Sequence, residues 1–158
     1  MDAFQSLISD LAKLTGLPLS PDERDGCILE SDGIFFTIQY RAAADDIVIF
    51  APVTDPDAAE RPTKAMLEKA LALAYKGKGT QGANLGMFNG ELILSVQFPM
   101  QGLDAETLGL KLSSFTDAAV SVKAEIASAM AEGDDDDGGK GVGEANGLEE
   151  DISQFMRV

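Results

Sequence analysis

The chain has 158 residues, the usual length of one domain, and 45% of them are hydrophobic, as in an ordinary globular core. Its 27 acidic and 12 basic residues give a net charge of −15, which argues against nucleic acid and anionic membranes as partners, because both bind clustered Lys and Arg. No run approaches the ~20 apolar residues that span a bilayer, the N-terminus lacks a signal-peptide pattern, and the single cysteine fits a reducing compartment, so we expect a cytoplasmic protein.

An amphipathic helix is predicted at the N-terminus. Asp2 and Gln5 are placed as a capping box at its start, and Gly16 is a helix stop. The spacing of its apolar residues is typical of a helix with one face against a core. Those residues are Phe4, Leu7, Ile8, Leu11 and Leu14.

Three strands are predicted next, over residues 27–30, 34–40 and 47–51. Asp32-Gly33 lies between the first two strands and predicts a hairpin, because glycine adopts a positive φ without steric cost. Pro52 ends the third strand.

Large apolar residues occupy both faces of these strands. Phe35 lies on the opposite face of its strand from Ile34 and Phe36, and Val48 and Phe50 alternate with two isoleucines. With few helices to cover both faces, we expect an exposed hydrophobic patch of the kind that marks a protein-binding site. The alternative is that the first and third helices cover one face each.

The second predicted helix begins at Pro56 or Pro62 and ends at Lys76; either proline suits a first helical turn, so the start stays open. Its apolar residues, which include Met66, Leu67 and Leu71, span roughly 160° of the helix circumference. A helix that covers a single sheet face needs a narrower stripe. The extra width predicts a second contact surface, and another copy of the chain is the commonest partner.

A loop over residues 76–82 leads to a second hairpin. Asn89-Gly90 is its turn, and Leu92 and Leu94 alternate along the strand that follows. Asp104 is a suitable N-cap for a long third helix. The order α-β-β-β-α-β-β-α, with antiparallel hairpins, predicts an α+β sandwich and not a doubly wound parallel sheet.

Residues 132–158 are predicted to form a region separate from the α+β domain of residues 1–131. Residues 133–147 are acidic and Gly-rich, as in a disordered linker. A short terminal helix and a frayed tail are equally compatible with the spacing of the last apolar residues. These are Leu148, Ile152, Phe155 and Met156.

No pattern predicts catalysis, a cofactor or a metal. The chain has no histidine, and Cys27 lies inside a predicted strand, where a buried structural thiol is expected. Residues 77–82 match G-x-G-x-x-G, but a nucleotide loop follows a strand and opens a helix, whereas this one follows a helix. The acidic run 134–137 is a poor calcium loop, because Gly133 occupies the first ligand position. We therefore expect a protein-binding module and not an enzyme.

A known family is similar in sequence over about residues 1–131. Residues 85–99 (LGMFNGELILSVQFP), followed by Leu103-Asp104 and a long helix through Phe115, resemble the late hairpin and C-terminal helix of the class I type III secretion chaperones, the Tir-chaperone (CesT-like) family. The resemblance implies a cytoplasmic homodimer that binds the extended N-terminal segment of a secreted effector protein and keeps it secretion-competent. The alternative is a regulatory domain of the same fold that is not tied to secretion.

The resemblance also implies two sets of contact residues. Dimer contacts in the family involve the second helix and the later strands, which are here Met66, Leu67, Leu71, Leu92 and Leu94. Cargo in the family wraps over the first helix and first strands, which are here Leu7, Leu11, Phe35, Val48 and Phe50. The segment beyond residue 131 departs from the family pattern, and one hypothesis is that it shields the apolar patch when no cargo is bound.

Overall fold

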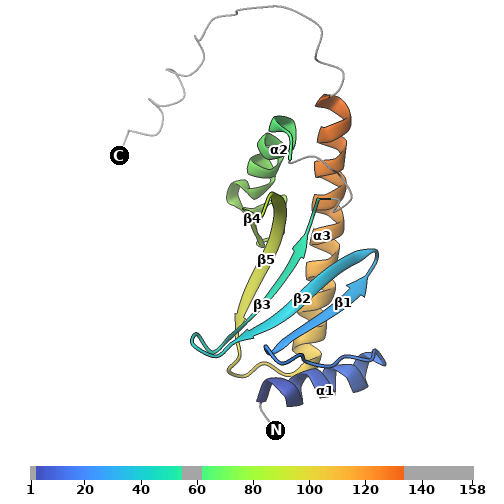
Figure 1. Cartoon of the computed structure of the whole chain (residues 1–158), viewed down its shortest axis with the longest axis vertical. Helices are drawn as coiled ribbons and strands as arrows, with labels where there is room; N and C mark the ends of the chain where they lie inside the picture. The colour runs from blue at the N-terminus through green and yellow to red at the C-terminus, as the bar shows by residue number, and fades with distance from the viewer. Residues whose placement is uncertain (1–2, 55–61, 134–158) are drawn as a thin grey trace, which may run out of the picture.

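The computed structural model describes residues 3–54 and 62–133, and its element order confirms the predicted α-β-β-β-α-β-β-α arrangement (Figure 1). A short 3-10 helix, η1, follows the second α-helix. The elements are α1 Ala3–Thr15, β1 Gly26–Ser31, β2 Ile34–Arg41, β3 Asp46–Pro52, α2 Lys64–Ala74, η1 Tyr75–Gly77, β4 Asn84–Phe88, β5 Glu91–Pro99 and α3 Ala105–Gly133.

The five strands form one antiparallel sheet in the order β1-β2-β3-β5-β4. Both predicted hairpins are present. The turn residues of each adopt positive φ, with Asp32 and Gly33 at 52° and 72° and Asn89 and Gly90 at 51° and 85°. Because β3 pairs with β5 and not with β4, strands β1 and β4 are the two edges of the sheet.

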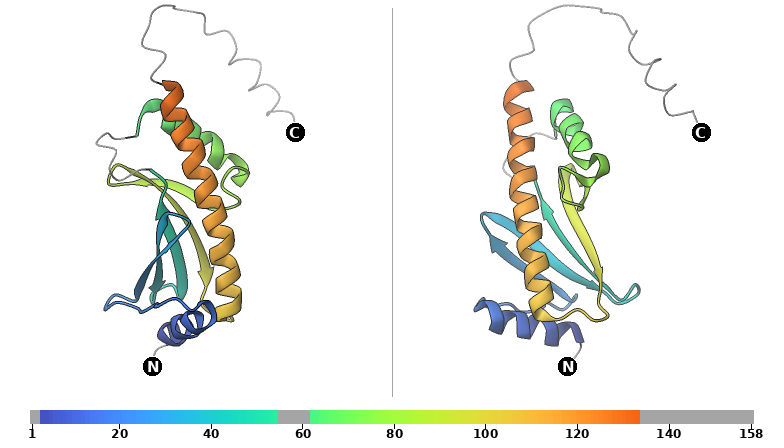
Figure 2. Two further views of the ribbon diagram at one scale, coloured as in Figure 1. Left: turned by 90° about the vertical axis from the view of Figure 1, so that its right-hand side faces the viewer. Right: turned by 180° about the vertical axis from the view of Figure 1, so that it is seen from behind.

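One face of the sheet carries the helices. Figure 2 shows α3 running along this face, with α1 across one end of it and α2 beside its other end. Alternate strand residues such as Ile38, Ile49 and Leu94 are fully buried there. Burying each such side chain contributes about 1.5–3 kcal/mol. The core therefore lies between the sheet and α3.

Side-chain caps fix where the later helices begin. Thr63 Oγ1 accepts a hydrogen bond from the Met66 N–H at 3.3 Å, so α2 begins one residue later, two residues beyond Pro62. Asp104 Oδ1 accepts from the Thr107 N–H at 2.7 Å, which confirms the predicted N-cap of α3. At Gly79 an added Cβ would lie 2.6 Å from the Leu73 side chain and 2.8 Å from its Cα, so the turn after η1 needs glycine.

Two apolar residues near helix ends are exposed in the structure, and the sequence had placed the first of them on an apolar helix face. Leu14 in α1 is 60% exposed and Met130 in α3 is 45% exposed. Each lies in the last turn of its helix, where fewer neighbours cover it. The capping residue Asp2, the helix start at Pro56 and the predictions for residues 134–158 lie outside the described residues.

Candidate protein-binding surfaces

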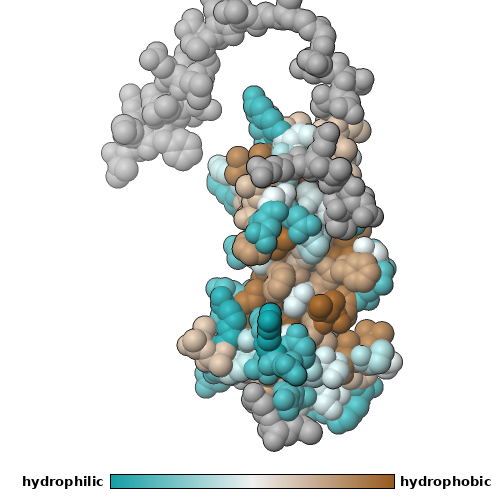
Figure 3. All heavy atoms as spheres, viewed as in Figure 1, coloured by the Kyte–Doolittle hydropathy of each residue, from teal (hydrophilic) through white to brown (hydrophobic). Residues whose placement is uncertain are grey.

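The outer sheet face, defined as the face opposite α3, carries an apolar strip. Ile28 is 70% exposed and Phe35 is 59% exposed, and Phe50 is half-buried. The register places Ile28 and Phe50 on either side of Thr37 in one row across β1, β2 and β3. Figure 3 shows apolar side chains gathered over this face. No helix within residues 3–54 and 62–133 covers it (Figure 2).

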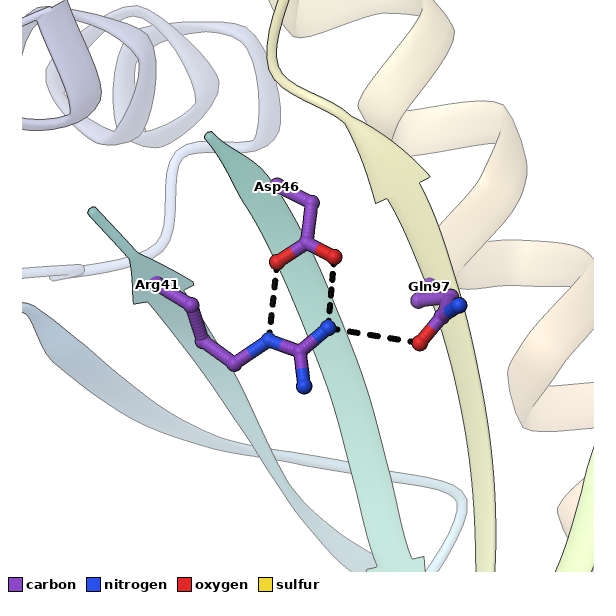
Figure 4. A network of polar contacts seen from close by, with 3 residues as sticks. All are labelled: Arg41, Asp46 and Gln97. Carbon is purple, nitrogen blue, oxygen red and sulfur yellow. Dashed lines mark hydrogen bonds and ion pairs between the residues drawn. The ribbon is translucent and has the colours of Figure 1, made fainter. Parts of the chain in front are cut away.

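A polar network borders this strip (Figure 4). The Arg41 guanidinium donates to both carboxylate oxygens of Asp46, with Nε 2.8 Å from Oδ1, and its Nη2 donates to Gln97 Oε1 at 3.3 Å. The hydrogen bond from Arg41 lowers the pKa of Asp46, and the same bond raises the pKa of Arg41. Both groups therefore stay charged at neutral pH and tie β2, β3 and β5 together.

Three of the five residues expected to bind cargo lie together on the outer sheet face: Phe35, Val48 and Phe50. Leu7 and Leu11 do not, because α1 packs against α3 and buries them to 6% and 0% exposure. Their side chains offer no surface to another chain in this structure. Sequence reasoning missed Ile28, although the two-residue repeat of a strand already places Ile28 on the opposite face from Cys27 and Leu29.

A second apolar surface, the α2–β4 patch, consists of Leu67, Leu71, Tyr75 and Met87. Leu71 on α2 is 74% exposed, and Tyr75, four residues later at the start of η1, is 62% exposed. Leu67 lies one turn before Leu71 on α2. Met87 on edge strand β4 is 63% exposed. Leu67 and Met87 line one cavity of about 530 Å³, which shows that the helix and the strand contribute to the same surface.

The residues expected at a dimer interface are only partly on this surface. Leu71 is exposed and Leu67 is half-buried, whereas Met66, Leu92 and Leu94 are buried to 7%, 3% and 0% exposure. The two strand leucines lie on the helix-covered face of the sheet and belong to the core. Tyr75 and Met87 were not predicted from the sequence.

The described part of the chain gives little support for metal binding, a reactive cysteine or nucleotide binding. Within it, no three Cys, Asp or Glu residues are grouped to hold a metal ion. Cys27 is buried, and desolvation raises the pKa of its thiol. The Gly77–Gly82 loop follows η1 and enters β4, unlike a nucleotide loop. Among the helices that the structure describes, none is long and apolar enough to cross a membrane.

The fold and its two exposed apolar surfaces define an α+β protein-binding domain. The sequence model of the Tir chaperone protein (CesT) family matches residues 6–123, and the chain belongs to this family. This is a family of chaperones, the class of protein that the resemblance in residues 85–99 predicted. A comparison with curated proteins by sequence finds no match.

Solved structures share the fold. A chain of the HopA1–SchA chaperone–effector complex is 16% identical with a TM-score of 0.63, over 77% of this chain and 93% of that one. A chain of the ExsC–ExsE complex is 21% identical with a TM-score of 0.60, over 73% and 86%. The Yersinia pestis type III secretion chaperone SycH, in complex with a YscM2 fragment, gives 14% identity and a TM-score of 0.55, over 75% and 98%.

Proposed function

We propose that the chain is a cytoplasmic chaperone of a type III secreted effector, which it binds through the effector's N-terminal region and keeps secretion-competent. The outer sheet face, which none of the described helices covers, carries this proposal. Membership of the Tir chaperone family supports it, as do fold relatives that include a chaperone–effector complex. No observation favours the regulatory alternative.

The outer sheet face suits an extended segment more than a folded partner. Ordering an unfolded segment costs about 1–2 kcal/mol per residue in backbone entropy, so the surface must offer apolar contacts along its length. Ile28 and Phe50 provide such contacts in one row across the strands, and Phe35 adds another, two residues before Thr37 along β2. Ile28 belongs to edge strand β1, whose free side can also pair with an added strand.

We further infer that the chain forms a homodimer through the α2–β4 patch. Exposed aromatic and aliphatic side chains on one surface are typical of a protein–protein contact. Leu71 and Tyr75 are the most exposed apolar residues of α2 and η1, and Met87 extends the surface onto β4. This surface is distinct from the outer sheet face, so self-association and cargo binding do not compete for the same residues.

The test of cargo binding compares the wild-type chain with Phe35→Asp. Each chain is tagged and purified from its native host, bound proteins are identified by mass spectrometry, and limited proteolysis maps the protected segment. The wild type should retain one dominant partner, whose N-terminal segment is protected from the protease. Phe35→Asp should lose most of the bound partner. Val120→Asp on α3, where the wild-type residue is 41% exposed, is the matched control and should bind normally.

The outcome against the proposal is equally clear. Recovery of the wild-type chain alone, or with a folded partner that Phe35→Asp also retains, would contradict a cargo site on the outer sheet face.

A further inference from the structure

A second cavity lies on the helix side of the sheet, where β5 continues past the end of β4. Strand β4 pairs with β5 only as far as Asn84 opposite Ser95, but β5 runs on to Pro99. The end of β5 therefore has no strand beside it on that edge, and a cavity of about 510 Å³ opens between β5 and α3. We call it the α3–β5 groove; it is lined by Thr80, Gln81, Gly82, Ala83, Val96, Phe98, Thr107, Leu110, Lys111, Ser114, Phe115 and Ala118.

The chemistry of the α3–β5 groove favours an apolar ligand that carries negative charge. Its walls include Val96, Phe98 and Phe115, and Leu110 at its edge is 67% exposed. Lys111 is the single charged lining residue, with Nζ 4.0 Å from the centre of the Phe98 ring. Within residues 3–54 and 62–133 no carboxylate lies within ion-pair distance of Lys111. Lys111 is therefore free to pair with an acidic group of an occupant, in a chain whose net charge is −15.

One buried hydroxyl in the wall of the α3–β5 groove has no hydrogen-bond partner among the described residues. Thr80 is fully buried at the wall of the groove, and its Oγ1 has no hydrogen-bond partner among the described residues. A buried hydroxyl without a partner costs about 1–3 kcal/mol.

We propose that the C-terminal segment of the same chain, residues 148–158, docks in the α3–β5 groove. The sequence of the segment matches the groove in both respects. Leu148, Ile152, Phe155 and Met156 are spaced as one apolar face of a helix, the geometry of a helix-in-groove contact. Residues 149–151 are Glu-Glu-Asp, which complement Lys111.

The chain is long enough for this contact within one molecule. α3 continues from Ala118, at the near end of the groove, to Gly133, about 22 Å at about 1.5 Å per residue. Residues 134–147 supply 14 further residues of Gly-rich sequence, and a free chain of that length has a root-mean-square span of about 20 Å and a maximum near 46 Å. Tethering gives the segment an effective concentration of about millimolar, so a weak contact suffices.

This docking differs from the shielding of the outer sheet face that the sequence suggested. The α3–β5 groove lies on the opposite side of the sheet from Phe35 and Phe50, so a docked segment leaves the cargo surface free. The contact is independent of the proposed function. Loss of cargo binding would leave it untouched, and its absence would leave cargo binding untouched.

Hydrogen exchange of the full chain, followed by mass spectrometry, tests the contact. Amides in residues 150–157 should exchange at least about tenfold more slowly than in a synthetic peptide of residues 148–158, since docking protects them. Phe155→Asp should abolish the protection, and Ser153→Asp, which adds the same charge to a polar position, should retain it. On the groove side, Leu110→Asp should abolish protection, and Val120→Asp should retain it. Leu110 and Val120 are both exposed on α3, so the fold tolerates both changes, but only Leu110 lines the groove.

Three results would overturn the proposal. The first is exchange of the segment at the rate of the free peptide. The second is protection that survives Leu110→Asp, which would place the segment elsewhere on the chain. The third is protection that rises with protein concentration, which would mean docking on a second copy.

Discussion

The substitution Leu71→Ala tests the homodimer, and the exposure of Leu71 sets the expected loss of dimer affinity. Leu71 is 74% exposed, so dimerisation can bury about three-quarters of its side chain, which contributes about 1–2 kcal/mol. A two-fold interface contains the residue twice, and the expected loss is about 2–4 kcal/mol. The dimer Kd should therefore rise about 30- to 1000-fold. Alanine keeps the helical preference of α2, and the exposed position leaves the fold intact.

Sedimentation equilibrium over a range of concentrations measures this Kd. Leu14→Ala is the matched control, because Leu14 is 60% exposed on α1, away from the α2–β4 patch. The wild type and Leu14→Ala should show the same dimer affinity, and circular dichroism should show three chains of equal helix content. An unchanged Kd for Leu71→Ala, or equal weakening by both substitutions, would refute the assignment of this surface.

Three further predictions concern the fold. Leu94 is fully buried, so Leu94→Ala should lower the free energy of unfolding by about 2–5 kcal/mol in urea titrations. Leu94→Met, which nearly keeps the side-chain volume, should lower it by less than about 1.5 kcal/mol. Equal losses for the two variants would contradict this packing. The N–H of Thr107 lowers the pKa of Asp104 below its usual 3.8, so its stabilisation is complete above about pH 4 and is lost as the pH falls through the lowered pKa. The gap in Tm between wild type and Asp104→Ala should therefore narrow from pH 7 to pH 2, and a widening gap would reverse the sign of the argument. Burial raises the pKa of Cys27, so iodoacetamide should label the thiol only as urea unfolds the chain; fast labelling of the native chain would show that the strand opens.

Local chemistry made the element order predictable. Asp32-Gly33 and Asn89-Gly90 determine their hairpins through positive φ, and Asp104 determines the start of α3 through a hydrogen bond three residues away. These features depend on neighbouring residues alone, so a single sequence reveals them. The start of α2 was harder to place, because two prolines and a threonine lie within a few residues of each other.

The contact residues were harder to predict because they depend on pairing between distant segments. Pairing of β3 with β5 sets the order of the sheet and leaves β4 on an edge, which no local pattern indicates. The same pairing turns Leu92 and Leu94 toward the helix-covered face of the sheet, although alternation alone left their direction open. Leu7 and Leu11 were assigned to cargo by family position, but helix α1 buries them against α3.

The two edges of the sheet differ in a way that has a consequence for assembly. A domain with two self-complementary edges can add copies at both ends without limit, whereas an isologous contact at one edge closes at two copies. Here the α2–β4 patch involves edge strand β4, and β1 at the far edge carries Glu30 in each copy. Repulsion between like charges would oppose pairing of β1 with another β1. An exposed apolar sheet can thus stay available to a foreign chain without becoming the start of a filament.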